Sequence, residues 1–106
     1  MKSLPLIVSF FLACFATGAQ AAPAVSVEIT KFAFAPKEIT VAPGTVIGWT
    51  NHDEIPHTVD ATDKSFRSKA MDTDDHYEHT FSQPGDYAYF CAVHPFMTGI
   101  VHVRNP

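Results

Sequence analysis

Short runs in which apolar and polar residues alternate occupy much of the chain beyond residue 24. A period of two is typical of a β-strand with one buried face, because successive side chains point to opposite sides of the sheet. The run at residues 98–103 predicts a last strand that turns Ile100 and His102 to one face and Val101 and Val103 to the other. The other runs that share this pattern are residues 25–34, 37–41, 45–51, 76–81 and 85–91.

Turn-forming residues separate these runs. Ala42-Pro43-Gly44 divides two of them, and a Ser-Gln-Pro-Gly-Asp sequence at residues 82–86 divides two more. No long stretch shows a helical period, and β-branched and aromatic residues fill the runs. The pattern predicts an all-β fold, a Greek-key antiparallel β-sandwich of about seven or eight strands. Residues 60–75 are polar and break the alternation, so we expect a long surface crossover there.

The first 21 residues have the features of a signal peptide. Lys2 precedes an apolar run from Leu4 to Phe15, and Ala19-Gln20-Ala21 forms a small-x-small cleavage pattern. The apolar run is too short and too interrupted for a permanent membrane helix. We therefore expect residues 1–21 to be removed on export to the periplasm, leaving residues 22–106 as a single domain.

An alternative reading of the same segment is a lipoprotein signal. Phe11-Leu12-Ala13-Cys14 loosely resembles a lipobox, with Cys14 as the lipid-bearing residue, although the usual first residue is Leu. If cleavage follows Ala21 instead, Cys91 is the single cysteine of the mature chain. An unpaired thiol is a liability in an oxidising compartment unless something occupies it, and a bound metal would do so.

The charge balance excludes one class of partner. Without Lys2 the mature chain carries six basic and eleven acidic residues, a net charge of −5. Nucleic-acid binding proteins present a basic face, so this composition argues against such a role. A chain of this size also buries a small core, and a metal that ties segments together would add stability.

The segment YFCAVHPFMTGIVHV places three potential metal ligands at fixed steps, namely Cys91, His94 and Met97. Thiolate, imidazole and thioether are soft or borderline metal donors, and a trigonal metal site needs a second histidine beside them. WTNHDEIPHTV offers His52 and His57 for this role. We favour His57, which follows a proline and opens a short β run, whereas His52 lies in a polar turn.

The remaining candidates have simpler interpretations. His76 and His79 lie near acidic residues and could suggest a second metal site, but strand or loop positions facing solvent are more common. His102 on the last strand is expected to be a structural histidine with satisfied hydrogen bonds. The acidic run of Asp72, Asp74 and Asp75 is expected to be solvated surface.

GDYAYFCAVHPFM and WTNHDEIPHTV together resemble the cupredoxins, the small blue copper proteins, and among them the amicyanins. The resemblance spans Val25 to Arg104 and rests most heavily on the Cys-x-x-His-x-x-Met spacing. It implies one type 1 copper ion bound by His57, Cys91, His94 and Met97.

The resemblance also implies that Asn51 hydrogen-bonds across to the ligand loop. Ala92 stands where a hydroxyl often meets this asparagine, so the bond must go to the backbone or be lost. Val93 replaces a proline of the amicyanin loop and therefore has a backbone N–H. If that N–H points at the Cys91 sulfur, it would favour Cu(I) and raise the reduction potential.

A plane of two histidines and a cysteine with a distant methionine suits both copper oxidation states and leaves no open position for a substrate. We therefore expect a periplasmic one-electron carrier, monomeric and not an enzyme, with a copper chaperone or storage protein as the alternative. The resemblance implies that redox partners dock on an apolar patch around His94, formed by Ile55, Pro56, Pro95 and Phe96.

Overall fold

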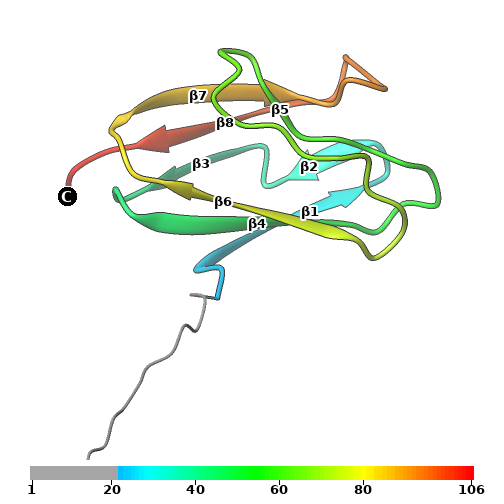
Figure 1. The fold of residues 1–106 in the computed structure, drawn as a ribbon, viewed down its shortest axis with the longest axis horizontal. Helices are drawn as coiled ribbons and strands as arrows, with labels where there is room; N and C mark the ends of the chain where they lie inside the picture. Colours follow the sequence, from blue (N-terminus) through cyan, green and yellow to red (C-terminus); the bar gives the residue numbers. More distant parts are fainter. Residues whose placement is uncertain (1–21) are drawn as a thin grey trace, which may run out of the picture.

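The computed structural model describes residues 22–106, so the expected signal peptide and the lipobox at Cys14 lie outside the described residues. The described chain contains eight strands and no helix, as the sequence predicts (Figure 1). They are β1 (Val25–Thr30), β2 (Ala33–Ala35), β3 (Glu38–Val41), β4 (Thr45–Asn51), β5 (Asp60–Ala61), β6 (His76–Phe81), β7 (Gly85–Phe90) and β8 (Thr98–Val103). No helix in this part of the chain is available to span a membrane.

The strands form two four-stranded sheets that face each other (Figure 1). One has the order β2-β1-β4-β6 and the other β3-β8-β7-β5. The pairings are antiparallel except for β1 with β4 and β3 with β8, which are parallel, and the structure confirms the predicted all-β sandwich. The two parallel pairs arise because the chain crosses between the sheets after each strand from β2 to β6, so these neighbours are joined by crossovers rather than by hairpins.

The core lies between the sheets and is rich in aromatic rings. Trp49 is fully buried, and its ring centroid lies 5.4 Å from that of Tyr89 in an edge-to-face contact. On β8, Val101 and Val103 are buried while His102 is partly exposed, which confirms the predicted faces of this strand. Each buried valine or isoleucine stabilises the fold by about 1.5–3 kcal/mol through removal of apolar surface from water.

Residues 60–75 differ from the expected polar crossover. The segment begins with the short strand β5, and Phe66 and Met71 enter the hydrophobic core. His79 is also not solvent-facing as expected, because its ring packs against Phe66, with centroids 4.6 Å apart. The run of three residues from His57 to Val59 forms no strand, and His57 instead makes an isolated β-bridge with Met71.

Candidate metal centre

Three connections meet at one end of the sandwich (Figure 1). They are the β1–β2 turn at residues 31–32, the loop that follows β4, and the loop between β7 and β8 at residues 91–97. Two backbone hydrogen bonds close the last of these loops. The Cys91 N–H donates to the Met97 carbonyl at 3.1 Å, and the Met97 N–H donates to the His94 carbonyl at 2.9 Å. The predicted ligands of this loop are therefore held in a single tight turn.

His57, Cys91 and His94 bring three donor atoms together, as the sequence predicts. The Cys91 Sγ lies 3.7 Å from His57 Nδ1 and 3.9 Å from His94 Nδ1, and the two nitrogens are 3.2 Å apart. A metal centred in a trigonal plane, with ordinary bonds to nitrogen and sulfur, would hold two nitrogens about 3.5 Å apart and nitrogen and sulfur about 3.8 Å apart. The arrangement thus fits a metal ion of this size without rearrangement of the side chains.

The site is buried except at one ligand. His57 and Cys91 have no exposed surface and Met97 is 2% exposed, whereas His94 is partly exposed. Met97 belongs to the same core cluster as Cys91, so its thioether is held in the protein interior. In the described part of the chain, His57, Cys91 and His94 are the only group of three or more metal-binding side chains that converge in this way.

Asp53 fixes the ring of His57. Its Oδ2 accepts a hydrogen bond from His57 Nε2 at 2.8 Å, which holds the proton on that nitrogen and leaves Nδ1 free to bind a metal. The same carboxylate accepts backbone hydrogen bonds from Lys31 at 2.6 Å and Phe32 at 2.9 Å. Burial raises the pKa of Asp53, but the hydrogen bonds from Phe32, His57 and Lys31 outweigh it and hold the pKa below the usual value.

Phe32 covers the site from the β1–β2 turn. Its ring meets the rings of His57 and His94 edge-on, with centroids 5.3 Å and 5.0 Å away, and stacks on Phe96 at 6.4 Å. Lys31 and Phe32 both have positive φ angles, 53° and 57°, a backbone conformation that non-glycine residues seldom adopt. The hydrogen bonds to Asp53 stabilise this turn. Sequence reasoning did not find Phe32, because nothing in the alternating pattern indicates a turn that folds over the metal ligands.

Thr58 ties the two ligand loops together. Its N–H donates to Cys91 Sγ at 3.3 Å, and its hydroxyl accepts a hydrogen bond from the Ala92 N–H at 2.8 Å. The hydroxyl proton goes to Asp60 Oδ2 at 2.6 Å. The sequence analysis missed this residue, although a threonine directly after a candidate histidine ligand was the available signal.

Asn51 makes no hydrogen bond to the ligand loop, so of the two expected alternatives the structure shows that the bond is lost. Its side-chain NH₂ donates to the carbonyls of Ile55 at 3.0 Å and Met71 at 2.9 Å, and its Oδ1 accepts from the Asp53 N–H at 2.9 Å. Asn51 therefore shapes the loop that carries His57, and Thr58 takes the bridging role. The backbone N–H that donates to the Cys91 sulfur is likewise that of Thr58 and not that of Val93.

The family of copper-binding proteins described as plastocyanin/azurin matches residues 21–104. The chain belongs to this family. Amicyanin from Paracoccus versutus is 38% identical over 88 residues, which cover 78% of this chain and 67% of that protein. Amicyanin-alpha from Methylorubrum extorquens is 35% identical over 92 residues, which cover 80% of this chain and 77% of that protein. This cupredoxin therefore resembles the amicyanins, as the ligand-loop spacing indicates.

Solved structures agree with this assignment. A reduced amicyanin variant superposes with a TM-score of 0.74 at 30% identity, covering 80% of this chain and 86% of the other. The purple cupredoxin from Nitrosopumilus maritimus superposes with a TM-score of 0.72 at 29% identity, and the match covers 76% of this chain and 99% of the other. A copper-containing nitrite reductase from Thermus scotoductus gives 0.75, but the match covers only 25% of that enzyme. Amicyanin-like cupredoxins are blue copper electron carriers, and the cofactor of this cupredoxin is one copper ion.

Two histidines outside the centre form ion pairs elsewhere. His52 is exposed and pairs with Glu28, consistent with its rejection as a ligand. His102 lies between two carboxylates, with Nδ1 2.7 Å from Asp86 and Nε2 2.6 Å from Glu38, which confirms its structural role. These hydrogen bonds raise the pKa of His102 above the usual value for a histidine.

Proposed function

We propose that this cupredoxin is a periplasmic type 1 copper protein that carries single electrons between redox partners, with His57, Cys91, His94 and Met97 as the copper ligands. The convergence of His57 Nδ1, His94 Nδ1 and Cys91 Sγ within 3.9 Å of one another is the observation that carries this proposal. Copper bound to this donor set supplies a one-electron Cu(II)/Cu(I) couple.

The surrounding residues support fast electron transfer because they hold the donors in place. Asp53 orients His57, Thr58 contacts Cys91 and Ala92, and Met97 is packed in the core. A donor set that is already arranged needs little reorganisation when the charge of the site changes. The same packing disfavours easy release of the metal, which a copper chaperone would require.

His94 provides the route to a partner. It is the partly exposed member of the set, and the surface around it is apolar. The predicted docking residues Ile55, Pro56, Pro95 and Phe96 are all exposed, with Phe96 at 71%. Phe32 and Val93 are also exposed hydrophobic residues, at 38% and 53%. We propose that partners dock on this apolar rim (Phe32, Ile55, Pro56, Val93, Pro95 and Phe96).

The location of the protein is part of the same proposal. Residues 1–21 would act as the signal peptide, and the mature monomer of residues 22–106 would work in the periplasm. Sequencing of the N-terminus after export would test the cleavage site after Ala21. A mature chain that starts at a lipid-modified Cys14 would support the lipoprotein alternative.

Two measurements on the copper-loaded protein separate electron transfer from copper handling. A carrier should show a reversible one-electron potential and rapid electron exchange with a redox partner, and should lose copper only slowly to a strong Cu(I) chelator. A chaperone or storage protein should instead release copper readily and exchange electrons slowly. Rapid copper loss with slow exchange would overturn the proposed function.

A further inference from the structure

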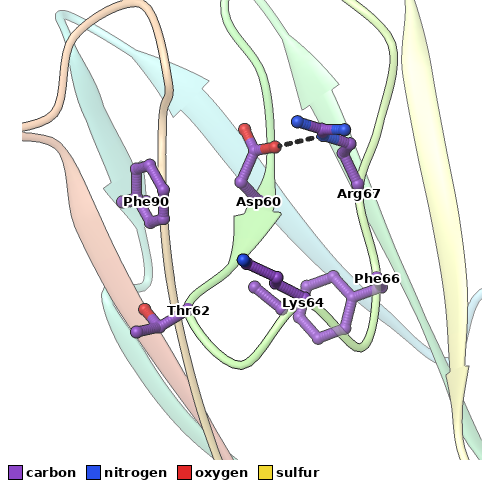
Figure 2. Close-up of a pocket in the computed structure, with 7 residues that line it drawn as sticks. Asp60, Thr62, Lys64, Phe66, Arg67 and Phe90 are labelled. Carbon is purple, nitrogen blue, oxygen red and sulfur yellow. Dashed lines mark hydrogen bonds and ion pairs between the residues drawn. The ribbon is translucent and has the colours of Figure 1, made fainter.

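A pocket with a volume of about 330 Å³ opens beside strand β5, separate from the copper ligands. Figure 2 shows Phe90 on one side of it and Phe66 and Arg67 on the other, with Lys64 and Thr62 nearer the turn. The residues that line it are Asp60, Ala61, Thr62, Lys64, Phe66, Arg67 and Phe90. Its volume is at the small end of the range for ligand sites, which suits a small organic molecule.

A chain of hydrogen bonds leads from this pocket to the copper thiolate. Arg67 Nε donates to Asp60 Oδ1 at 3.1 Å, as the dashed line in Figure 2 marks. Asp60 Oδ2 accepts the Thr58 hydroxyl proton at 2.6 Å, and the Thr58 N–H donates to Cys91 Sγ at 3.3 Å. Asp60 is 7% exposed, so its charge is poorly screened and Arg67 is the cation that balances it.

The chemistry of the lining favours an anion with an apolar body. Lys64 and Arg67 are cationic, and no ion pair engages Lys64 among the described residues. The Arg67 side chain is 79% exposed and donates to Asp60 through Nε. Its terminal N–H groups can therefore donate to a ligand. Phe66 and Phe90 offer apolar surface beside these cations. A carboxylate on a small aromatic ring matches both features.

We propose that this pocket binds a small aromatic carboxylate and that its occupancy lowers the reduction potential of the copper site. The inference rests on the function proposed above. The ligand carboxylate pairs with Arg67 and Lys64 and draws Arg67 away from Asp60. The negative charge of Asp60 is then less balanced, and its effect reaches the Cys91 thiolate through Thr58. More negative charge beside the thiolate stabilises Cu(II) relative to Cu(I).

Binding is tested first on metal-free protein, so that its outcome does not depend on copper. Benzoate is titrated while backbone amide signals are followed by NMR. Saturable shifts should appear at Thr62, Lys64 and Phe66, and benzyl alcohol should bind more weakly because it has no charge. Arg67→Gln should weaken benzoate binding about tenfold or more, the loss expected for a charge-assisted hydrogen bond.

Arg104→Gln is the matched control, because it removes a half-exposed arginine that also pairs with an aspartate, Asp86. Arg104 follows β8 at the opposite end of the sandwich from the copper loop (Figure 1). This variant should bind benzoate as the wild type does. Shifts that fail to saturate, or equal weakening of benzoate binding in both variants, would overturn the proposal that this pocket binds the ligand.

Coupling is tested on the copper-loaded protein. Benzoate should lower the potential of the wild type and leave the blue band intense. Arg67→Gln should have a lower potential without ligand, and benzoate should change it little. Asp60→Asn should have a higher potential, since a negative charge is removed. Benzoate that binds with no change in potential would overturn the coupling, whereas absence of the blue band in wild-type protein would instead contradict the proposed function.

Discussion

The Phe32 ring lies edge-on against the His94 ring, with the two centroids 5.0 Å apart. The same ring also contacts His57 at 5.3 Å, so one side chain of the β1–β2 turn covers both histidines of the copper site. His94 is otherwise the most accessible of the three converging donors. This contact indicates that Phe32 restricts access to the proposed copper site as well as forming part of the proposed docking surface.

Phe32→Ala should open the site. Removal of the ring leaves space beside both histidines, so copper should be extracted faster by a chelator and imidazole should perturb the visible spectrum at lower concentration. Stopped-flow absorbance measures the first effect. Ile55→Ala is the control, because it removes a different exposed hydrophobic side chain of the same apolar rim, one that is 36% exposed. Equal rates for wild type and Phe32→Ala would show that Phe32 does not cover the site.

Asp53→Ala should destabilise the metal-free protein by about 1–3 kcal/mol, because a carboxylate that accepts hydrogen bonds from Lys31, Phe32 and His57 is lost. Denaturant unfolding measures the change. Asp63 accepts a hydrogen bond from the Ser65 N–H in an exposed turn, so Asp63→Ala is a suitable control with a change within about 0.5 kcal/mol. Similar effects of both variants would contradict the claim that the hydrogen bonds to Asp53 stabilise the fold.

The ion pairs of His102 with Glu38 and Asp86 should make the stability of the fold depend on pH. Hydrogen bonds to Asp86 and Glu38 raise the pKa of His102 above 6.5 in the folded state. Its contribution is therefore fully present below the unfolded-state pKa and is lost as pH rises through the folded-state pKa. The difference in unfolding free energy between metal-free wild type and His102→Gln should be larger at about pH 5.5 than at about pH 8.5. The comparison with this variant cancels the contributions of groups that the substitution leaves unchanged. A difference independent of pH would contradict the assignment.

Phe96→Glu should slow bimolecular electron transfer with a redox partner at every ionic strength and leave the blue spectrum unchanged. An apolar surface allows close approach without the ordering of long side chains, and a charge at the 71% exposed Phe96 removes this advantage. Neutralisation of Asp74 and Asp75 should matter only at low salt, since exposed charges act mainly on the association rate. A wild-type rate for Phe96→Glu would exclude this surface as the docking site.

The strands and the donor set could be predicted because each follows from local patterns. Alternation placed Val101 and Val103 on one face of the last strand, the face that the structure buries, and the spacing of Cys91, His94 and Met97 confined them to one turn. His57 was separable from His52 because a proline precedes it, although the β run expected after it proved to be only an isolated bridge to Met71.

The surroundings of the site could not be predicted, because they depend on contacts between segments distant in the sequence. Phe32 reaches the histidines through a turn with positive φ angles, which Asp53 stabilises from 21 residues away. The sequence could not decide whether Asn51 reaches the backbone of the ligand loop, and in the structure Thr58 bonds to that loop while Asn51 bonds to Met71. Phe66 and Met71 enter the core from a segment whose composition is polar.

The visible spectrum of the mature chain, loaded with Cu(II), tests the central claim most directly. Cys91 Sγ lies within 3.9 Å of both histidine donors, so its thiolate should donate charge to the metal and give one intense blue band per chain. Cys91→Ser should remove that band. A wild-type protein that binds one copper ion with only weak visible absorption, or a serine variant with an equally intense band, would contradict the assignment of a type 1 copper site.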